Sequence, residues 1–191
     1  MKKQILFSQL KKDYDQYISY RQKVIENSNK ILRLAKQAIF SLHRNEIQPA
    51  NRYLKRTEDL LIKLKKYFPK NISLEDEGTY KAAIEEYIEA KLFWQILTTG
   101  RISKIKNFKF NFDDYLAALC DLTGELLRKI VLLATNGENK KAIYLKEIIA
   151  GIMSELIKFD LTGYLRHKYD EAKRNLKRAE EIIYEINIRS H

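Results

Sequence analysis

The sequence predicts an all-α protein, a single-domain bundle of about six helices with a long N-terminal helix. Only two prolines and six glycines interrupt the 191 residues. The segments between these breaks repeat apolar residues every three or four positions, which is the period of a helix with one buried face. No alternating apolar–polar run of useful length indicates a strand. There is no linker or low-complexity segment, so we expect one domain over residues 1–191.

The first predicted helix covers about residues 6–45, which contain no glycine or proline. Its apolar positions keep the helical period throughout, and they include Leu10, Tyr14, Tyr17, Val24, Ile31, Ala35, Ala38 and Leu42. Helices in globular proteins seldom reach this length. The helix therefore needs either a bundle partner along its whole extent or a place at a subunit interface.

Five further helices follow from the positions of the breaks. Pro69 ends the second helix, Gly100 ends the third, and Asn136 with the glycine after it forms a turn signal behind the fourth. Asn111 or Asp113 is the candidate N-cap of the fourth helix, because a short polar side chain accepts a hydrogen bond from the free N–H groups there. The expected ranges are about 50–68, 79–99, 111–135, 139–159 and 164–188.

The formal net charge is +11, and the excess of positive charge lies in one part of the chain. Residues 1–70 contain 17 Lys or Arg and 6 Asp or Glu, whereas residues 71–191 contain 19 of each class. A concentrated basic field favours a polyanionic partner, either nucleic acid or an anionic membrane surface. The alternative is that these side chains only coat a solvated helix face.

The composition also limits the compartment and the chemistry. No stretch is long and apolar enough to span a bilayer, and the first residues lack the apolar region of a signal peptide, so we expect no membrane partner. The single cysteine, Cys120, excludes an internal disulfide framework and a cysteine-based zinc site. A buried core thiol is the favoured interpretation over a nucleophile. A reducing, cytoplasmic location is the default expectation.

Two pairs of carboxylates have spacings that place both members on one helix face. Glu86 and Glu89 are three residues apart, and Asp121 and Glu125 are four residues apart. The second pair lies among apolar residues, and buried carboxylates need cations or hydrogen-bond donors. Four carboxylates from two helices suit Mg²⁺ or Mn²⁺, which prefer oxygen ligands. The alternative is that these acids form salt bridges with neighbouring helices.

Three segments together resemble the translin–TRAX family. Residues 21–44 resemble the long first helix of translin, which closes on an apolar run and His-Arg, here His43 and Arg44. Residues 114–126, which contain the run Asp-Leu-Thr-Gly-Glu, resemble the most recognisable block of the family. Residues 165–189 resemble its last helix. The three segments stand in the expected order and cover most of the chain.

The resemblance implies a translin-like helical fold that assembles into a hollow octamer with nucleic acid on its inner surface. TRAX-like subunits also cut RNA with metal-dependent carboxylates. The positions of those carboxylates match Glu86, Glu89, Asp121 and Glu125. The resemblance therefore implies an endoribonuclease site that uses Mg²⁺ or Mn²⁺. The connection after the third helix is short where TRAX has a long insertion, so we expect a minimal form that assembles with itself.

Two functions remain open at this point. In the first, a homo-oligomer binds RNA or single-stranded DNA and cleaves RNA through the four acids. In the second, the acids only serve packing, and the assembly binds nucleic acid without cutting it. A scaffold with no nucleic-acid role would show no binding at low salt. His43 is interpreted as a simple polar residue at a helix end. Basic side chains of the first helix are expected to contact phosphates: Lys11, Lys12, Arg21, Lys23, Lys30, Arg33, Lys36 and Arg44.

Overall fold

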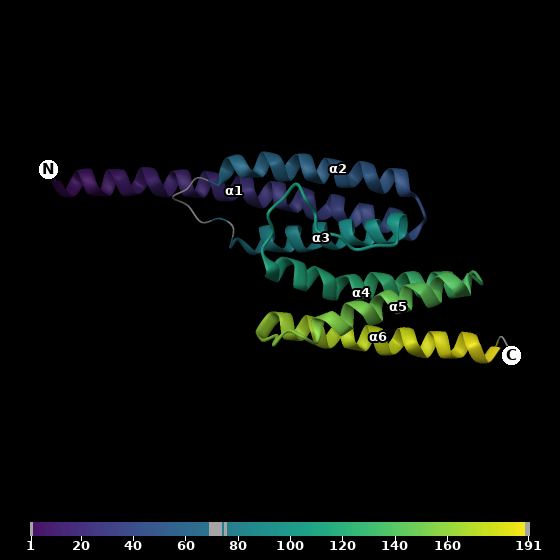
Figure 1. Ribbon diagram of the computed structural model, residues 1–191. Coiled ribbons are helices and arrows are strands. Elements are labelled where there is room, and N and C mark those ends of the chain that lie inside the picture. The colour runs from purple at the N-terminus through teal and green to yellow at the C-terminus, as the bar shows by residue number, and fades with distance from the viewer. Residues whose placement is uncertain (1, 69–73, 75, 190–191) are drawn as a thin grey trace.

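The computed structural model describes residues 2–68, 74 and 76–189. Its elements are α1 (Lys2–His43), α2 (Ile47–Leu64), the 3₁₀ turn η1 (Lys65–Tyr67), α3 (Gly78–Thr99), α4 (Phe112–Thr135), α5 (Asn139–Leu156) and α6 (Gly163–Arg189) (Figure 1). These residues contain no strand, so the predicted all-α fold with six helices is confirmed. None of the described helices combines the length and the hydropathy needed to cross a bilayer. α2 begins at Ile47 and ends at Leu64, earlier at both ends than the predicted range 50–68, because the chain tightens into η1 after Leu64; Pro69 itself lies outside the described residues.

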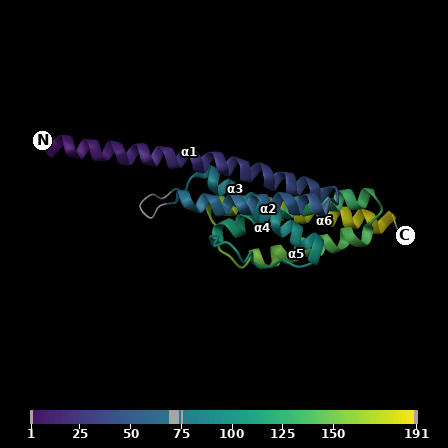
Figure 2. The same ribbon diagram turned by 90° about the horizontal axis from the view of Figure 1, so that it is seen from above.

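The helices form two groups that meet at α3 and α4. α1 packs against α2 and α3, whereas α4 packs against α5 and α6 (Figures 1 and 2). The contact between α3 and α4 joins the groups, so this pair stands between α1 and α6. Tyr87, Phe93 and Leu122 are among the fully buried side chains of the shared core. Cys120 is buried there as predicted, and burial raises the pKa of its thiol to about 12.

Local interactions explain where several helices begin and end. Asn111 is the cap of α4, and it forms a capping box in which Asp114 accepts the Asn111 backbone N–H over 3.1 Å. α5 ends at Leu156, earlier than predicted, because the chain turns there and Phe159 N–H donates to the Leu156 carbonyl over 3.1 Å. Gly163 then takes a φ of 53° where α6 begins, a conformation that glycine adopts without a steric cost.

Lys129 of α4 forms hydrogen bonds with the C-terminal end of α1. Its buried ammonium donates to the Leu42 carbonyl (3.1 Å), the His43 carbonyl (2.9 Å) and the Asn45 amide oxygen (2.8 Å). The last carbonyls of a helix have no partner within the helix, and a cation is favourable at that end of the helix dipole. The contact therefore fixes the last turn of α1, including His43, beside α4.

The N-terminal part of α1 projects beyond the bundle (Figures 1 and 2). The side chains of residues 5–16 are all exposed, whereas the bundle-facing side of α1 is buried from Val24 onward. For so long a helix we expect either a bundle partner along its whole extent or a subunit interface, and the described residues provide no bundle partner for residues 5–16. A place at a subunit interface stays a prediction.

Candidate nucleic-acid interface and acidic cluster

The four predicted acids come together where α3 packs against α4. Glu86 and Glu89 lie on α3, and Asp121 and Glu125 lie on α4. Each pair shares one helix face, and the packing brings the two pairs close enough for Glu89 to interact electrostatically with the other three carboxylates. We call these four residues the acidic cluster.

Glu89 is the most deeply buried member of the acidic cluster, with 7% of its surface exposed. Burial, followed by the negative charges of Glu86 and Asp121, raises the pKa of the Glu89 carboxyl well above its usual range. None of the residues that the structure describes donates a hydrogen bond to this carboxylate. A buried carboxylate in this position is unfavourable unless it is protonated or meets a cation.

The other three acids each contact a side chain from α1 or α6: Lys36 with Glu86, His43 with Glu125, and Lys168 with Asp121. The Lys36 Nζ atom lies 3.9 Å from the Glu86 carboxylate, and the other two contacts are direct hydrogen bonds. α1 and α6 thus supply the partners of acids on α3 and α4, and two of these partners are lysines. The expectation that these acids form salt bridges with neighbouring helices holds for Glu86 and Asp121, whereas Glu125 is hydrogen-bonded to His43.

Lys168 is a protonated counter-charge inside the cluster. Its ammonium donates to Asp121 and lies 3.3 Å from Glu85, which also accepts the Tyr164 hydroxyl over 2.7 Å. Burial acts to lower the pKa of Lys168, but the hydrogen bonds to Asp121 and Tyr164 outweigh it and raise the pKa overall. Lys168 therefore offsets part of the negative charge that the four acids place together.

The interpretation of His43 as a simple polar residue at a helix end needs correction. Its side chain is buried, and its ring packs against Phe93 with the ring centroids 5.1 Å apart. Nε2 bonds the Glu125 carboxylate, while Nδ1 is buried without a hydrogen-bond partner among the described residues. The contact of Lys129 with the end of α1 holds the ring in place, so His43 orients Glu125.

The donor set of the acidic cluster suits Mg²⁺ or Mn²⁺, because it consists of carboxylates and one of them, Glu89, accepts no hydrogen bond from the described residues. Its present arrangement is one of ion pairs. In the part of the chain that the structure describes, no three His, Cys, Asp or Glu side chains are placed to hold one metal ion together. Coordination by Asp121 and Glu125 would require exchange of their contacts with Lys168 and His43.

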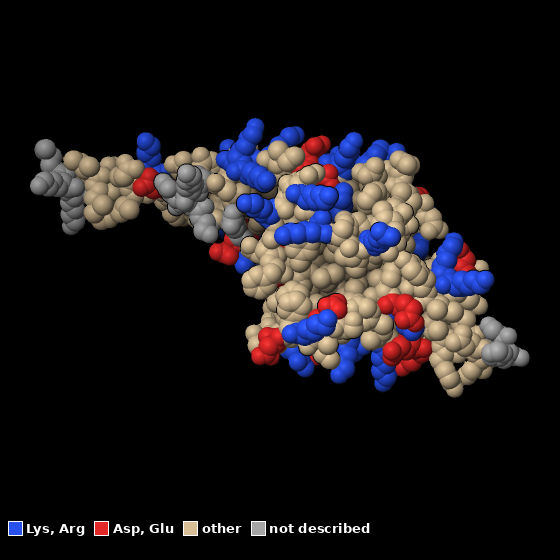
Figure 3. All heavy atoms as spheres, in the orientation of Figure 1, with Lys and Arg blue, Asp and Glu red and all other residues tan. Residues whose placement is uncertain are grey.

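Basic side chains gather over α1 and α2 (Figure 3). Four of them line a groove of about 320 Å³ between these helices, together with Asp59: Lys30, Arg33, Arg56 and Lys63. We call it the basic groove, and such a row of cations suits the phosphates of a nucleic acid. Lys36 lies three residues after Arg33, one turn further along α1, so the groove leads toward the acidic cluster.

The remaining predicted phosphate contacts are engaged within the chain or lie on the projecting part of α1. Ion pairs hold three of them: Arg21 with Glu77 at 2.8 Å, Arg44 with Glu46 at 2.8 Å, and Lys11 with Asp15 at 2.5 Å. Lys23 Nζ lies over the ring of Tyr67, 5.3 Å from its centroid, and Lys12 is exposed. A cation that already forms an ion pair binds a phosphate less strongly. Lys30 and Arg33 are therefore better placed to contact phosphates.

Three residues of these sites were not predicted from the sequence: Arg56 and Lys63 in the basic groove, and Lys168 at the acidic cluster. A signal for the first two existed, because Arg56 and Lys63 are seven residues apart and so lie on one face of a helix. Lys168 had no comparable signal. It is 47 residues away from Asp121 in the sequence, and only the packing of α6 on α4 brings the two together.

Known proteins resemble this chain over most of its length. The family model described as "Translin family" matches residues 19–190. The Translin-associated protein X homolog of Schizosaccharomyces pombe is 32% identical over 131 residues, and the Translin of Bos taurus is 31% identical over 119 residues. These matches cover 61% and 58% of this chain but 55% and 51% of the relatives. The chain therefore spans about half the length of these curated relatives.

Several solved structures share the helical fold of this chain. Apo-NeC3PO superimposes with a TM-score of 0.85 at 22% identity, covering 94% of this chain and 96% of that one. AfC3PO gives a TM-score of 0.87 at 20% identity, covering 95% and 97%, and its complex with duplex RNA gives 0.85 at 19% identity, covering 95% and 96%. The family match covers nearly all of the chain and these structures share its helical fold, so the chain belongs to the Translin family.

Proposed function

We propose that the protein is a nucleic-acid-binding homo-oligomer that holds single-stranded or structured RNA in the basic groove and cleaves it at the acidic cluster with Mg²⁺ or Mn²⁺. The observation that carries this proposal is the position of Lys36. It stands one helical turn from Arg33 of the groove, and its ammonium lies 3.9 Å from Glu86. A phosphate chain that follows the groove is led to the acids. The family supports the proposal, since AfC3PO, which shares the fold, has been solved in complex with duplex RNA.

The residues of the site have distinct tasks in this proposal. When bound, a divalent ion supplies charge neutralisation at the phosphodiester and activation of the attacking water. Glu89, which accepts no hydrogen bond from the described residues, and Asp121 contribute carboxylate oxygens to hold it. His43 keeps the Glu125 carboxylate oriented. Lys36 lowers the repulsion between the acids and an approaching phosphate, because it adds positive charge on the groove side of Glu86.

A second candidate function is an assembly that binds nucleic acid without cutting it. The side-chain contacts favour it, since three of the four acids already have partners on α1 and α6. In that case the contacts of the acidic cluster stabilise the packing of α1 and α6 against α3 and α4. Incubation of labelled single-stranded RNA with the protein and Mg²⁺ separates the two functions: fragments are expected for the nuclease, and intact bound RNA for the second candidate. We expect an octamer in either case.

The double replacement Arg33→Gln and Arg56→Gln is expected to weaken RNA binding by removing two cations from the basic groove. The log–log slope of affinity against salt should become shallower by about 0.7 per lost phosphate contact on a single strand. Fluorescence anisotropy of a labelled oligoribonucleotide, titrated at several NaCl concentrations, measures both quantities. The same titration with single-stranded DNA compares the two nucleic acids.

Lys177→Gln is the matched control, because Lys177 is exposed on α6 and lies on another helix from the groove. This variant should keep the wild-type slope. If the control and the groove variant bind RNA with the same slope as the wild type, RNA does not contact the basic groove.

A further inference from the structure

The projecting part of α1 carries an apolar stripe that packs against no other helix among the described residues. We call residues 5–16 the arm. Phe7, Leu10 and Tyr14 are 59%, 52% and 59% exposed. Their spacing of three and four residues continues in register with the buried positions Val24 and Ile31 further along α1. The arm therefore has the face of a helix that packs against other helices, over a length of about 18 Å.

The other side of the arm is polar. Gln9 donates to Asp13 over 2.8 Å, and Lys11 pairs with Asp15 at 2.5 Å. Pairs of this kind support a solvent-exposed helix face. The arm is thus amphipathic. Its apolar face is exposed to solvent, although apolar helix faces are normally buried. The family model matches from residue 19, so the arm precedes the matched region.

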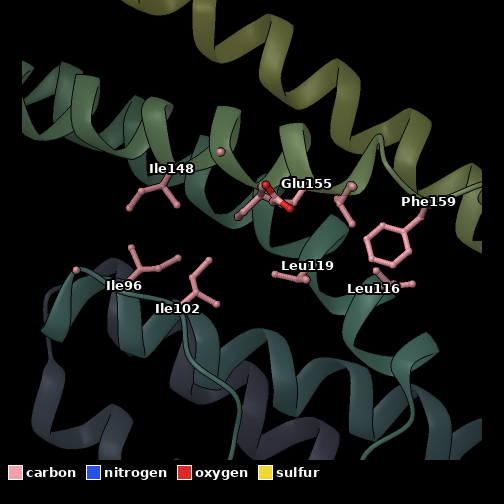
Figure 4. Close-up of a pocket in the computed structure, with 11 residues that line it drawn as sticks. Ile96, Ile102, Leu116, Leu119, Ile148, Glu155 and Phe159 are labelled. Carbon is pink, nitrogen blue, oxygen red and sulfur yellow. The ribbon is translucent and has the colours of Figure 1, made fainter.

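A second apolar surface lies open on the bundle, away from the acidic cluster. It is a cavity of about 520 Å³ between the end of α3, the N-terminal half of α4 and the C-terminal half of α5. Figure 4 shows Ile96, Ile102 and Ile148 pointing toward one another across it, with Leu119 and Phe159 further along. We call it the apolar groove. Ile102 and Phe159 at its rim are 41% and 52% exposed.

Gly151 indicates what kind of ligand the apolar groove accepts. It lies inside α5, where glycine is a poorer helix former than alanine, and it lines the groove. A Cβ atom built at this position would meet nothing within 4 Å. The packing of this chain therefore gives no reason for a glycine here. A bare backbone on an apolar surface allows another backbone to approach closely, as a packed helix does.

We propose that the arm of one copy packs in the apolar groove of a second copy, with its Phe7–Leu10–Tyr14 stripe against α4 and α5 and its backbone passing close to Gly151. The arm leaves the bundle as a straight continuation of α1, so it points away from the groove of its own chain (Figures 1 and 2). The arm and the groove are different surfaces of one protein. Their contact is heterologous, and repeated contacts of this kind close into a ring when the rotation allows it. This contact stands or falls independently of RNA cleavage.

Three variants of the full-length protein and one control test the contact by assembly mass in light scattering and by dissociation on dilution. Leu10→Asp places a charge on the apolar stripe. Gly151→Leu fills the space beside α5, and Gly151→Ala adds only one methyl group while favouring the helix. Ile62→Asp is the control, because Ile62 is 56% exposed on α2, outside both surfaces.

We expect Leu10→Asp and Gly151→Leu to weaken assembly at least about tenfold, and Gly151→Ala to weaken it less while its helix content by circular dichroism is kept or increased. Ile62→Asp should assemble like the wild type. If the Gly151 variants assemble normally while Leu10→Asp does not, the arm meets some other surface and the proposal is wrong. It is equally wrong if the wild type is a monomer or if none of the variants changes assembly.

Disulfide trapping distinguishes the partner surface. A mixture of Leu10→Cys and Ile102→Cys proteins should form a crosslinked pair of chains under mild oxidation, because the arm of the first would lie in the groove of the second. Neither variant alone should crosslink, since Cys120 is buried. Crosslinking of Leu10→Cys with itself would show pairing between two arms and would overturn the proposal.

Discussion

Replacing Glu125 with glutamine is expected to slow RNA cleavage at least about a hundredfold, the scale of losing one group that stabilises transition-state charge. Glutamine keeps an oxygen that accepts the hydrogen bond from His43 Nε2, so the ring of His43 and its packing stay in place. It removes a negative charge that the proposed metal site needs. RNA affinity should change by less than about twofold, since the basic groove lies on other helices. Single-turnover cleavage of end-labelled RNA with Mg²⁺ measures the rate.

Glu180→Gln provides the control for this experiment, because Glu180 is exposed on α6 and the replacement changes the net charge by the same amount. It should cleave at the wild-type rate. Equal cleavage by Glu125→Gln and the wild type would show that the acidic cluster does not take part in the reaction. A wild type that binds RNA but produces no fragments would support the non-cutting assembly.

Lys129→Met is expected to lower the free energy of unfolding by about 2–4 kcal/mol. Methionine keeps an apolar stem of similar length but removes the donors to three oxygen atoms at the end of α1. These oxygens lose a cationic partner where α1 contacts α4. Because one of them is the His43 carbonyl, the position of His43 also becomes less fixed. Urea unfolding followed by circular dichroism measures the change, at one fixed protein concentration because assembly adds to apparent stability.

Lys140→Met serves as the reference for that measurement, since Lys140 is exposed in the first turn of α5. We expect it to change stability by less than about 0.5 kcal/mol. A loss below about 1 kcal/mol for Lys129→Met would mean that the contact with α1 is not important for the stability of the bundle.

Some helix boundaries were predictable because they depend on neighbouring residues. Gly100 takes the left-handed φ of 69° that ends α3, and Asn111 at the start of α4 donates its backbone N–H to the side chain of Asp114, three residues later. The projecting arm was not predictable. The apolar period through Leu10 and Tyr14 is the same as the period through buried Val24, and periodicity does not tell whether the covering surface belongs to the same chain.

The candidate site was only partly visible in the sequence. The spacing within each acid pair is local, so the shared faces of Glu86 with Glu89 and of Asp121 with Glu125 could be predicted. The cations that pair with the acids come from distant parts of the chain. The burial of His43 and its bond to Glu125 depend on the packing of α1 and α4, which no local pattern encodes.

Whether RNA runs along the basic groove to the acidic cluster can be decided by photo-crosslinking. RNA that carries 4-thiouridine is bound to the assembled protein in EDTA, irradiated, and the crosslinked peptides are mapped by mass spectrometry. We expect crosslinks in α1 and α2 around Arg33 and Arg56, and in the α3 peptide that contains Glu86 and Glu89. Crosslinks confined to α5 and α6 would contradict this path.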